Sequence, residues 1–553
     1  MSHPDGPRTG RPPSIAANGM VSTPHHLATS AGLHALYKGG SAVDAAIAAN
    51  AVLTVVYPHM AGLGGDGFWL INGPATDGVE ALEASGPSAR LATADYYRDK
   101  GATDRIPDRG PLAALTVPGA VDGWRLAHER HGKLPWADLF AHAIRYAQDG
   151  MAITRSLADW LAADEAILSE YETTARTFLP DGRPAREGKK LVQAALAASL
   201  QDIASRGARG GFYEGDLAGR MTRALEQAGS PLRAEDFASY QARWVDPITT
   251  RYRDHDVWQL PPSTQGFAAL QLLNLLEGFD FSEIREGSAD YYHLLVEAVK
   301  IAFADRDEWL TDPAFVEIPL KRLLATDYAD ERRGLIDIGR ALDETSIQPG
   351  IRFSESDRMA RPGGDTVYFS AADAEGLVVS VIQSPYYDFG SAFIAGDSGI
   401  IMQNRGSFFS LDERHANFLE PGKKTFHTII PAMLTRDGET VMAYGTMGGE
   451  GQPQTQAAML TRMLDYGFDV QQAIEAPRWL MGRTWGTDTS SLTLESRIGD
   501  EVVSELKLRG QPVSMVGAWD GTLGHAQAIF VNQETGFYEG GADPRGDGSA
   551  AGW

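Results

Sequence analysis

The sequence changes character abruptly at residue 366. Residues 344–365 are rich in charge, Pro and Gly and show no sustained apolar period, which is typical of a mobile linker. From Thr366, apolar side chains alternate through Ala372, a turn follows at 373–376, and residues 377–382 read as a returning strand. The sequence therefore predicts a β-hairpin whose first strand opens with Thr366.

The bond between Asp365 and Thr366 is a candidate cleavage site. A cut there makes Thr366 an N-terminus, with a nucleophilic hydroxyl and, on the same residue, an α-amine that can act as its base. The competing interpretation is that Thr366 opens an ordinary strand. For an isolated Asp-Thr-Val the ordinary strand is the better interpretation, so the rest of the chain has to decide.

Bulk properties exclude several classes of protein. The length of 553 residues allows several domains or one large intertwined domain, and a hydrophobic fraction of 43% allows a large core. Cysteine is absent, which excludes disulfides, thiolate metal sites and a cysteine nucleophile. A net charge of −24 argues against nucleic acid or an anionic membrane as partner. No segment resembles a transmembrane helix or a secretory signal, so we expect a cytoplasmic protein.

The pattern along the chain favours α/β (α+β) layers built around antiparallel sheets. Residues 1–18 read as a disordered lead, and Ser41 reads as the N-cap of an Ala-rich helix that runs to about residue 56. Residues 68–71 read as a strand. Residues 135–340 are mainly helical in pattern, with a strand predicted over 249–260. After residue 366 strands and helices mix, including a helix over 454–466.

Two glycine-rich segments differ in what they indicate. The segment 62–67 follows a helix and precedes a strand, the reverse of the order in phosphate-binding loops, so it favours a tight backbone approach. Gly448 and Gly449 precede a predicted helix, where their N–H groups can face a developing oxyanion or simply form a turn. Local sequence supports both interpretations equally. The 13 histidines show no metal-binding spacing, so we predict no catalytic metal and no cofactor.

With these segments in place, the chain resembles the γ-glutamyltransferase family of N-terminal-nucleophile hydrolases over nearly its whole length. The segment 50–68, Asn-Ala-Val-Leu-Thr-Val-Val-Tyr-Pro-His-Met-Ala-Gly-Leu-Gly-Gly-Asp-Gly-Phe, resembles the family's N-terminal signature. Further blocks follow in the family's order: 117–121, 261–266, 297–306, 389–391, 399–400, 448–449 and 542–548.

This resemblance implies a fold and a mechanism. The fold is an αββα sandwich made as one precursor that cleaves itself. The heavy chain ends at Asp365, its ordered part starting at residue 19, and the light chain spans 366–553 and stays bound as a heterodimer. Thr366 is then the nucleophile that forms an acyl-enzyme. Ser384 stands where the family has a second threonine, and Gly448 and Gly449 are expected to form the oxyanion hole.

The departures from the family's pattern concern specificity. Glu83 stands where γ-glutamyl enzymes have the arginine that holds the substrate α-carboxylate, and Phe408 stands where they have the aspartate that holds its α-amine. Tyr386 replaces an asparagine, and the family's paired serines become His427 and Thr428. A bound glutamyl group would therefore keep two unpaired charges, at a cost of several kcal/mol in a desolvated site.

We therefore expect the chemistry to be retained and the specificity to be changed. The pattern around residues 382–384, 403–406 and 426–431 resembles the non-glutamyl branch of the family, which includes oxamate amidohydrolase and cephalosporin-acylase-like proteins. A small carboxylated amide suits Arg405, whose guanidinium can bind a carboxylate, although an internal salt bridge explains Arg405 equally well. The alternatives are a γ-glutamyltransferase or glutathione hydrolase, a cephalosporin-type acylase and, more remotely, an unprocessed binding protein.

Overall fold

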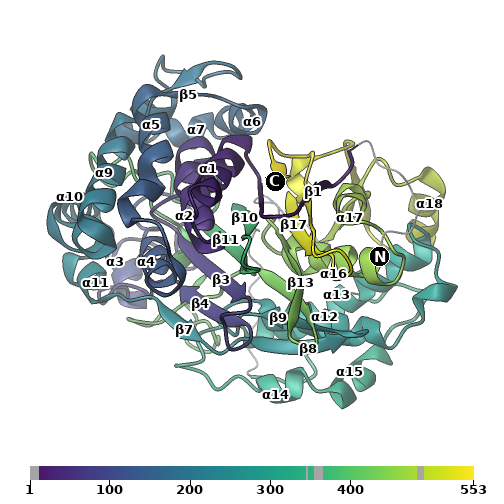
Figure 1. The fold of residues 1–553 in the computed structure, drawn as a ribbon. Coiled ribbons are helices and arrows are strands. Elements are labelled where there is room, and N and C mark those ends of the chain that lie inside the picture. The colour runs from purple at the N-terminus through teal and green to yellow at the C-terminus, as the bar shows by residue number, and fades with distance from the viewer. Residues whose placement is uncertain (1–10, 344–346, 354–364, 483–490) are drawn as a thin grey trace.

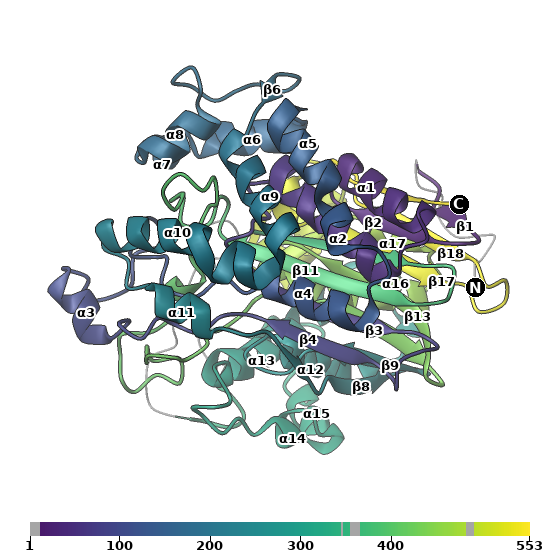
Figure 2. The same cartoon turned by 60° about the vertical axis from the view of Figure 1, so that its left-hand side comes forward.

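The structure is a computed structural model of the continuous chain, and it describes residues 11–343, 347–353, 365–482 and 491–553. Two seven-stranded antiparallel sheets stack face to face, and a layer of helices covers the outer face of each. Figure 1 shows the strands in the centre with helices on both sides, and Figure 2 shows the same layers from another direction. The expected αββα sandwich is confirmed.

Each sheet mixes strands from before and after residue 365. The first, called the hairpin sheet, has the spatial order β19 (Ser549–Gly552), β2 (Met20–Thr23), β10 (Asp365–Ala372), β11 (Val378–Tyr386), β3 (Asp66–Asn72), β4 (Glu80–Ala84) and β7 (Arg243–Val245). The second, called the glycine sheet, has the order β1 (Ser14–Ala16), β18 (Tyr538–Ala542), β17 (Ala526–Val531), β13 (Glu439–Thr446), β12 (Ala432–Arg436), β9 (His255–Gln259) and β8 (Ile248–Tyr252).

The central strands are apolar on both faces because both faces are covered. Along β3, Phe68 and Leu70 point into the core between the two sheets, where they join Met433 and Ile529 of the glycine sheet. The alternate residues, 69 and 71, join the core beneath the helices. Burial on both faces explains why these strands read as continuous apolar runs and not as polar–apolar alternation.

Helices cover the outer face of each large sheet. Against the hairpin sheet lie α1 (His26–Tyr37), α2 (Ala42–Val56) and α4 (Ala120–His131), and α5 (Ala141–Asp149) and α9 (Ala194–Ala208) pack on these helices. Against the glycine sheet lie α12 (Gly266–Glu277), α16 (Gly451–Leu464) and α17 (Val470–Glu475), and α13 (Ala289–Trp309) packs on α12 and α16.

Shorter elements complete the described chain. The remaining helices are α3 (Ala94–Asp99), α6 (Arg155–Ala163), α7 (Glu165–Ser169), α8 (Glu172–Phe178), α10 (Gly215–Gln227), α11 (Ala234–Ser239), α14 (Leu320–Leu323), α15 (Thr326–Arg333) and α18 (Asp500–Leu508). Two small sheets contain β5 (Met151–Ala152) with β6 (Lys190–Leu191), and β14 (Trp479–Met481), β15 (Leu492–Glu495) and β16 (Val513–Val516).

Local sequence signals account for α2 and for the hairpin. Ser41 is the N-cap of α2 and forms a capping box with Asp44, as the sequence predicts. Strands β10 and β11 form the predicted hairpin, with β11 continuing to Tyr386. Most of the predicted linker, residues 344–346 and 354–364, lies outside the described residues.

Three sequence predictions need correction. The lead predicted to be disordered through residue 18 contains strand β1, which pairs with β18, because the sheet edge offers unpaired backbone groups to a short segment, Ser14–Ala16. The single strand predicted over 249–260 is the hairpin β8–β9, which turns at Arg253 with φ +52°. Helix α16 begins at Gly451, three residues before the predicted start at 454.

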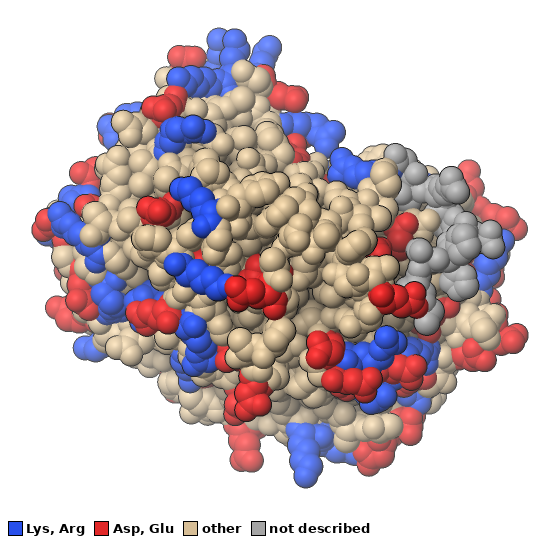
Figure 3. All heavy atoms as spheres, viewed as in Figure 1, with Lys and Arg blue, Asp and Glu red and all other residues tan. Residues whose placement is uncertain are grey.

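Charged side chains of both signs are interspersed over the face of the molecule shown in Figure 3. The excess of 73 acidic over 49 basic residues is thus not gathered there into one acidic surface. Within the described ranges, we find no helix with the length and apolarity needed to cross a membrane.

Candidate active site

A β-bulge in the hairpin brings Thr366 opposite Ser384. Asp365 pairs with Tyr386 and Val367 pairs with Gln383, so Thr366 faces the extra residue on β11. The side chain of Thr366 is 1% exposed, and its Oγ1 has no hydrogen-bond partner among the residues that the structure describes. A buried hydroxyl without a protein partner is available to a ligand or a reaction, although several other buried hydroxyls of the described chain, such as those of Thr116 and Ser370, also have no partner.

The backbone is strained just after Ser384. Tyr386 has φ +87°, a conformation that a bulky side chain rarely adopts. The backbone N–H of Tyr386 donates to Ser384 Oγ at 2.8 Å, so the strain accompanies a bond that fixes this hydroxyl. Strained residues of this kind gather at functional sites, where the surrounding fold holds them in place.

Gly448 and Gly449 form the turn between β13 and α16. Their φ angles are +117° and +52°, in the region that favours glycine. Both residues are buried, and neither backbone N–H donates a hydrogen bond to any part of the chain that the structure describes. Two unused N–H groups at the start of a helix, where its dipole adds positive potential, suit a developing oxyanion.

A buried side-chain network holds this turn. Gln265 donates through Nε2 to the carbonyl oxygens of Gly449 at 3.0 Å and Thr428 at 2.5 Å. Arg306 donates to Gln265 Oε1 at 3.1 Å and lies 3.4 Å from a carboxylate oxygen of Glu450. The network therefore ties the glycine turn to the segment that contains His427 and Thr428.

Arg405 is a fully buried cation in a short 3₁₀ turn, Arg405–Phe408. It donates to Thr428 Oγ1 at 3.0 Å and to Ser384 Oγ at 3.4 Å, and its guanidinium carbon lies 4.3 Å from the centroid of the Tyr386 ring. No carboxylate oxygen of the described residues comes within 4.0 Å of it, so the internal salt bridge is absent there. Burial lowers the pKa of Arg405 to about 10, which leaves it charged at neutral pH.

Three aromatic rings form an apolar wall beside Arg405. The ring of Phe408 lies 4.5 Å from the ring of Tyr386 and 4.5 Å from the ring of Phe426, measured between centroids. These side chains bring the predicted residues Ser384, Tyr386, Arg405, Phe408 and Thr428 into one site. Phe408 occupies space in this wall and offers no charge to a substrate amine.

Asp66 is a site residue that the sequence analysis did not identify. It opens β3 opposite Ser384 and is fully buried. Its Oδ1 accepts hydrogen bonds from Gln403 Nε2 at 3.0 Å, Gly119 N at 3.0 Å and Gly86 N at 3.3 Å, whereas its Oδ2 accepts none from the described residues. Burial raises the pKa of Asp66 to about 7, although the positive charge of Arg405 acts in the opposite direction.

His427 lies next to Asp66 without bonding to it. Its Nε2 is 3.6 Å from Asp66 Oδ2, and neither ring nitrogen has a hydrogen-bond partner among the described residues. Burial, with the charges of Arg405 and Lys424, holds the pKa of His427 well below 6.5, so the ring is neutral and this contact is no ion pair at neutral pH.

Glu83 is neutralised by two cations. Its carboxylate lies 2.7 Å from Arg243 Nε and 2.7 Å from Lys424 Nζ, and these charges lower its pKa although burial opposes them. Glu83 therefore belongs to an ion cluster at the edge of the site in which one carboxylate faces two cations. It supplies no unpaired negative charge to a substrate.

The residues that sequence analysis missed differ in the signal they gave. Asp66 stood in the quoted Gly-rich segment, two residues before the strand predicted over 68–71, and this position was the signal that could have identified it. Gln265 and Arg306 stood in quoted family blocks, but their contact with the glycine turn joins segments 184 residues apart in sequence, as for Gln265 and Gly449. Only the fold shows that contact.

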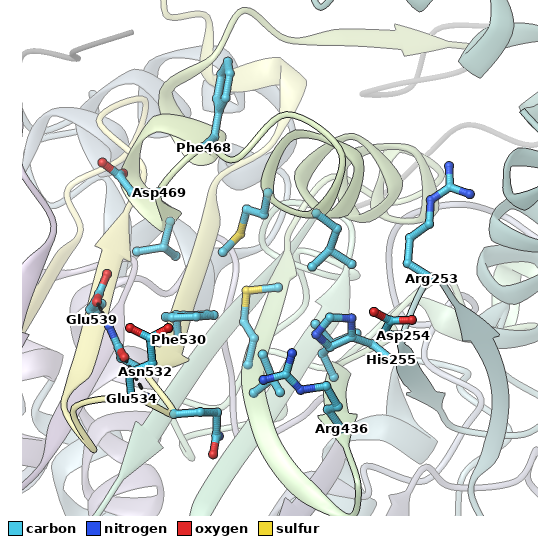
Figure 4. A pocket seen from close by; sticks show the side chains of 17 residues that line it. Arg253, Asp254, His255, Arg436, Phe468, Asp469, Phe530, Asn532, Glu534 and Glu539 are labelled. Atoms are coloured by element: carbon cyan, nitrogen blue, oxygen red, sulfur yellow. Dashed lines mark hydrogen bonds between the residues drawn. The ribbon is translucent and has the colours of Figure 1, made fainter. Parts of the chain in front are cut away.

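A cavity of about 250 Å³ lies elsewhere, at the far ends of β13 and α16 from Gly448 and Gly449. Figure 4 shows its labelled polar residues, among them His255, Arg436 and Glu539, around an apolar floor. Thr366, Ser384 and Arg405 are not among its lining residues. The site built around Thr366 is therefore a separate feature of the molecule.

Comparison with known proteins identifies the family. The model of the gamma-glutamyltranspeptidase family matches residues 28–553. The chain is 47% identical to the glutathione hydrolase-like YwrD proenzyme of Bacillus subtilis, over 97% of this chain and 99% of the relative. It is 40% identical to the oxamate amidohydrolase proenzyme of Klebsiella pneumoniae, over 98% of this chain and 99% of the relative.

A solved structure agrees with these relatives. The crystal structure of cephalosporin acylase from Bacillus halodurans superposes with a TM-score of 0.90 at 36% identity, covering 100% of this chain and 98% of that chain. These matches extend over the whole fold and are all to enzymes, so the alternative of a binding protein is set aside. The chain belongs to the gamma-glutamyltranspeptidase family and is an enzyme with the N-terminal-nucleophile hydrolase fold.

Proposed function

We propose that this enzyme is a self-processing amidohydrolase that uses Thr366 to hydrolyse a small amide bearing a carboxylate, of the oxamate type. The observation that carries the proposal is Arg405, a fully buried cation beside Ser384 with no carboxylate of the described chain within 4.0 Å. A buried charge with no counter-ion in contact is costly, and sites retain one where a ligand of opposite charge completes the pair.

Self-processing begins with the hydroxyl of Thr366. Its Oγ1 attacks the carbonyl carbon of Asp365, the C–N bond breaks, and the acyl group moves to oxygen as an ester. Water then hydrolyses the ester, which leaves a carboxylate on Asp365 and a free α-amine on Thr366. The heavy chain, which ends at Asp365, and the light chain 366–553 then stay together because strands of both chains are paired with one another within both sheets.

Turnover of substrate uses the same oxygen. Thr366 Oγ1 attacks the amide carbonyl while the α-amine of Thr366 takes its proton, and the N–H groups of Gly448 and Gly449 bind the oxyanion. Collapse breaks the C–N bond and releases ammonia with the transferred proton. Water then attacks the acyl-enzyme and returns Thr366. Ser384, fixed by the N–H of Tyr386, positions the nucleophile.

The pocket selects the acyl group by charge and shape. The guanidinium of Arg405 donates two parallel hydrogen bonds to the substrate carboxylate, and the faces of the Tyr386 and Phe408 rings lie against the guanidinium. A glutamyl group also carries an α-amine, and Phe408, a ring at the position where γ-glutamyl enzymes have an aspartate, offers it no anion. The neutralised Glu83 cluster offers none either.

The relatives support two other substrate classes. YwrD is described as glutathione hydrolase-like and the Bacillus halodurans protein as a cephalosporin acylase, so γ-glutamyl and acylase activities stay as alternatives. One assay compares them. Ammonia release from oxamate is measured beside release from a γ-glutamyl anilide and from a cephalosporin amide. The proposal requires the highest kcat/KM on oxamate or another short carboxylated amide, and a higher value on either competitor contradicts it.

A further inference from the structure

The site contains a second buried charge whose role the reaction does not explain. Asp66 is fully buried and lies across the β3–β11 ladder from Ser384. Three N–H groups hold its Oδ1, which fixes the carboxyl group in place. Its Oδ2 accepts no hydrogen bond from the described residues, so one oxygen remains able to take a proton.

Asp66 and Arg405 act on each other without touching. The charge of Arg405 lowers the pKa of Asp66, and the charge of Asp66 raises the pKa of Arg405, in each case against the larger effect of burial. No oxygen of Asp66 comes within 4.0 Å of Arg405. In a site without solvent, charges separated in this way still attract strongly. With the carboxyl ionised, Asp66 balances Arg405 and the empty site is neutral.

The other groups that face Asp66 leave this balance unchanged near neutral pH. His427 stays neutral because burial, with nearby positive charge, lowers its pKa well below 6.5. Tyr213 and Tyr240 stay neutral because burial raises the pKa of each phenol well above 10. Glu83 is paired with two cations, Arg243 and Lys424. Among the groups present before self-cleavage, Asp66 and Arg405 are therefore the pair whose charge balance changes near pH 7. The α-amine that cleavage leaves on Thr366 also titrates in this range, but it is present in Asp66→Asn as well, so it does not account for a pH dependence that this variant loses.

From this geometry we infer that Asp66 is the counter-ion of Arg405 in the empty site and takes up a proton when a substrate carboxylate binds. The inference rests on the proposed function, since it needs a carboxylate at Arg405. Two anions beside one cation would leave a net negative charge in a buried site. A proton from solvent added to Oδ2 converts Asp66 to a neutral acid and restores neutrality, with no bond made or broken elsewhere.

The consequence is a substrate affinity that depends on pH. Below the pKa of Asp66, about 7, the carboxyl already carries its proton and Arg405 is free for the substrate. Above it, binding an anion requires proton uptake, so the KM of an anionic substrate rises with pH. For one linked proton the rise is about fivefold between pH 7 and pH 8 and steepens toward tenfold per unit above that.

The test compares oxamate with oxamide, its neutral analogue of similar size, from pH 5.5 to 9. In the wild type we expect the KM of oxamate to rise above pH 7 while that of oxamide stays flat. In Asp66→Asn the rise should disappear and the KM of oxamate at pH 8 should fall below that of the wild type. Asp465→Asn, at another buried carboxyl bonded to Tyr252 and Arg253, should keep the wild-type profile.

The outcomes separate this inference from the proposed function. A parallel pH dependence for oxamate and oxamide in the wild type contradicts the counter-ion role, even where Asp66→Asn does not fold. A rise that persists in folded, self-cleaved Asp66→Asn contradicts it too. If either of these results is found but Arg405→Met still raises the KM of oxamate and not that of oxamide, the counter-ion role of Asp66 is contradicted and the proposed function is kept. If the wild type turns over no carboxylated amide, both the proposed function and the counter-ion role are contradicted.

Discussion

The guanidinium of Arg405 stacks on the ring of Tyr386 and donates to Thr428, so its position is fixed before any substrate enters. The strained backbone of Tyr386 presents this ring, and the same residue's N–H fixes Ser384. In the proposed mechanism, carboxylate recognition by Arg405 and positioning of the nucleophile by Ser384 thus depend on one strained residue. A preorganised cation binds an anion at a smaller entropic cost than a flexible one.

Replacing Arg405 should affect charged substrates selectively. We expect Arg405→Met to weaken turnover of carboxylated amides by about 2–4 kcal/mol, the scale for loss of a buried charge pair, and to affect neutral amides far less. Self-cleavage should stay intact on a denaturing gel. Arg405→Lys should recover only part of the loss because lysine lacks the planar fork. Arg414→Met, at an exposed arginine paired with Asp412, is the control. An equal loss on both substrate types would mean that Arg405 holds the fold.

Replacing Gly448 should affect the reaction rate. The φ of Gly448 is +117°, so alanine there is strained and shifts the N–H, although its Cβ would meet Gly524 Cα at an ordinary 3.4 Å. We expect Gly448→Ala to lower kcat by about 10²–10³-fold, the scale for one oxyanion donor. Gly438→Ala, in an open turn with φ +85°, carries similar strain away from the site. Equal kcat values for the two variants would remove Gly448 from the oxyanion hole.

The substrate preference follows from the missing charge partners. Phe408 and the neutralised Glu83 give the α-amine of a glutamyl zwitterion no anion to bind. We expect kcat/KM on a γ-glutamyl anilide to be lower than on oxamate by at least about 10²-fold, or roughly 3 kcal/mol for the unpaired charges. Steady-state rates on both substrates with one preparation check this. A glutamyl preference would transfer the proposal to glutathione hydrolysis.

Three buried histidines should make the fold sensitive to acid. Burial lowers the pKa of His25 to about 3 and of His525 to about 4, and it also holds that of His59 well below 6.5. The unfolded chain binds these protons near pH 6.5 and the folded chain does not, so stability is full above pH 6.5 and falls as pH drops toward 4. The loss is about 1.4 kcal/mol per pH unit for each histidine.

Urea midpoints between pH 7 and pH 4.5 measure this dependence. His525→Gln should reduce its slope, because the substitution removes one of the groups that binds a proton in the unfolded chain and not in the folded chain. His34→Gln, at an exposed helix position, should not change it. A slope that His525→Gln leaves unchanged would show that other groups control acid unfolding.

The sequence predicted the parts of the site that depend on local pattern. The hairpin after residue 365 and the N-cap at Ser41 follow from alternation and capping, which need no knowledge of the fold. The αββα layers followed from the family resemblance. The position of Thr366 opposite Ser384 could not be predicted, because it depends on the register of β10 and β11. That register includes a β-bulge for which the sequence pattern gives no signal.

The parts that could not be predicted depend on long-range contacts and on burial. Asp66 and His427 are 361 positions apart and meet only because β3 joins the hairpin sheet beside the loop that contains His427. The choice between an internal salt bridge and a free cation at Arg405 also needed coordinates, since the sequence offers 73 carboxylates. Strand β1 was missed because an edge strand of 3 residues carries too little pattern.

Self-cleavage before Thr366 is the central claim, and mass spectrometry of the denatured, purified protein tests it most directly. We predict two chains, the smaller beginning with Thr366 and ending with Trp553. Thr366→Ala should stay at full length and be inactive, and Thr366→Ser should cleave and keep some activity because it retains the hydroxyl and the amine. A wild-type protein that remains one intact chain while fully active would contradict the account.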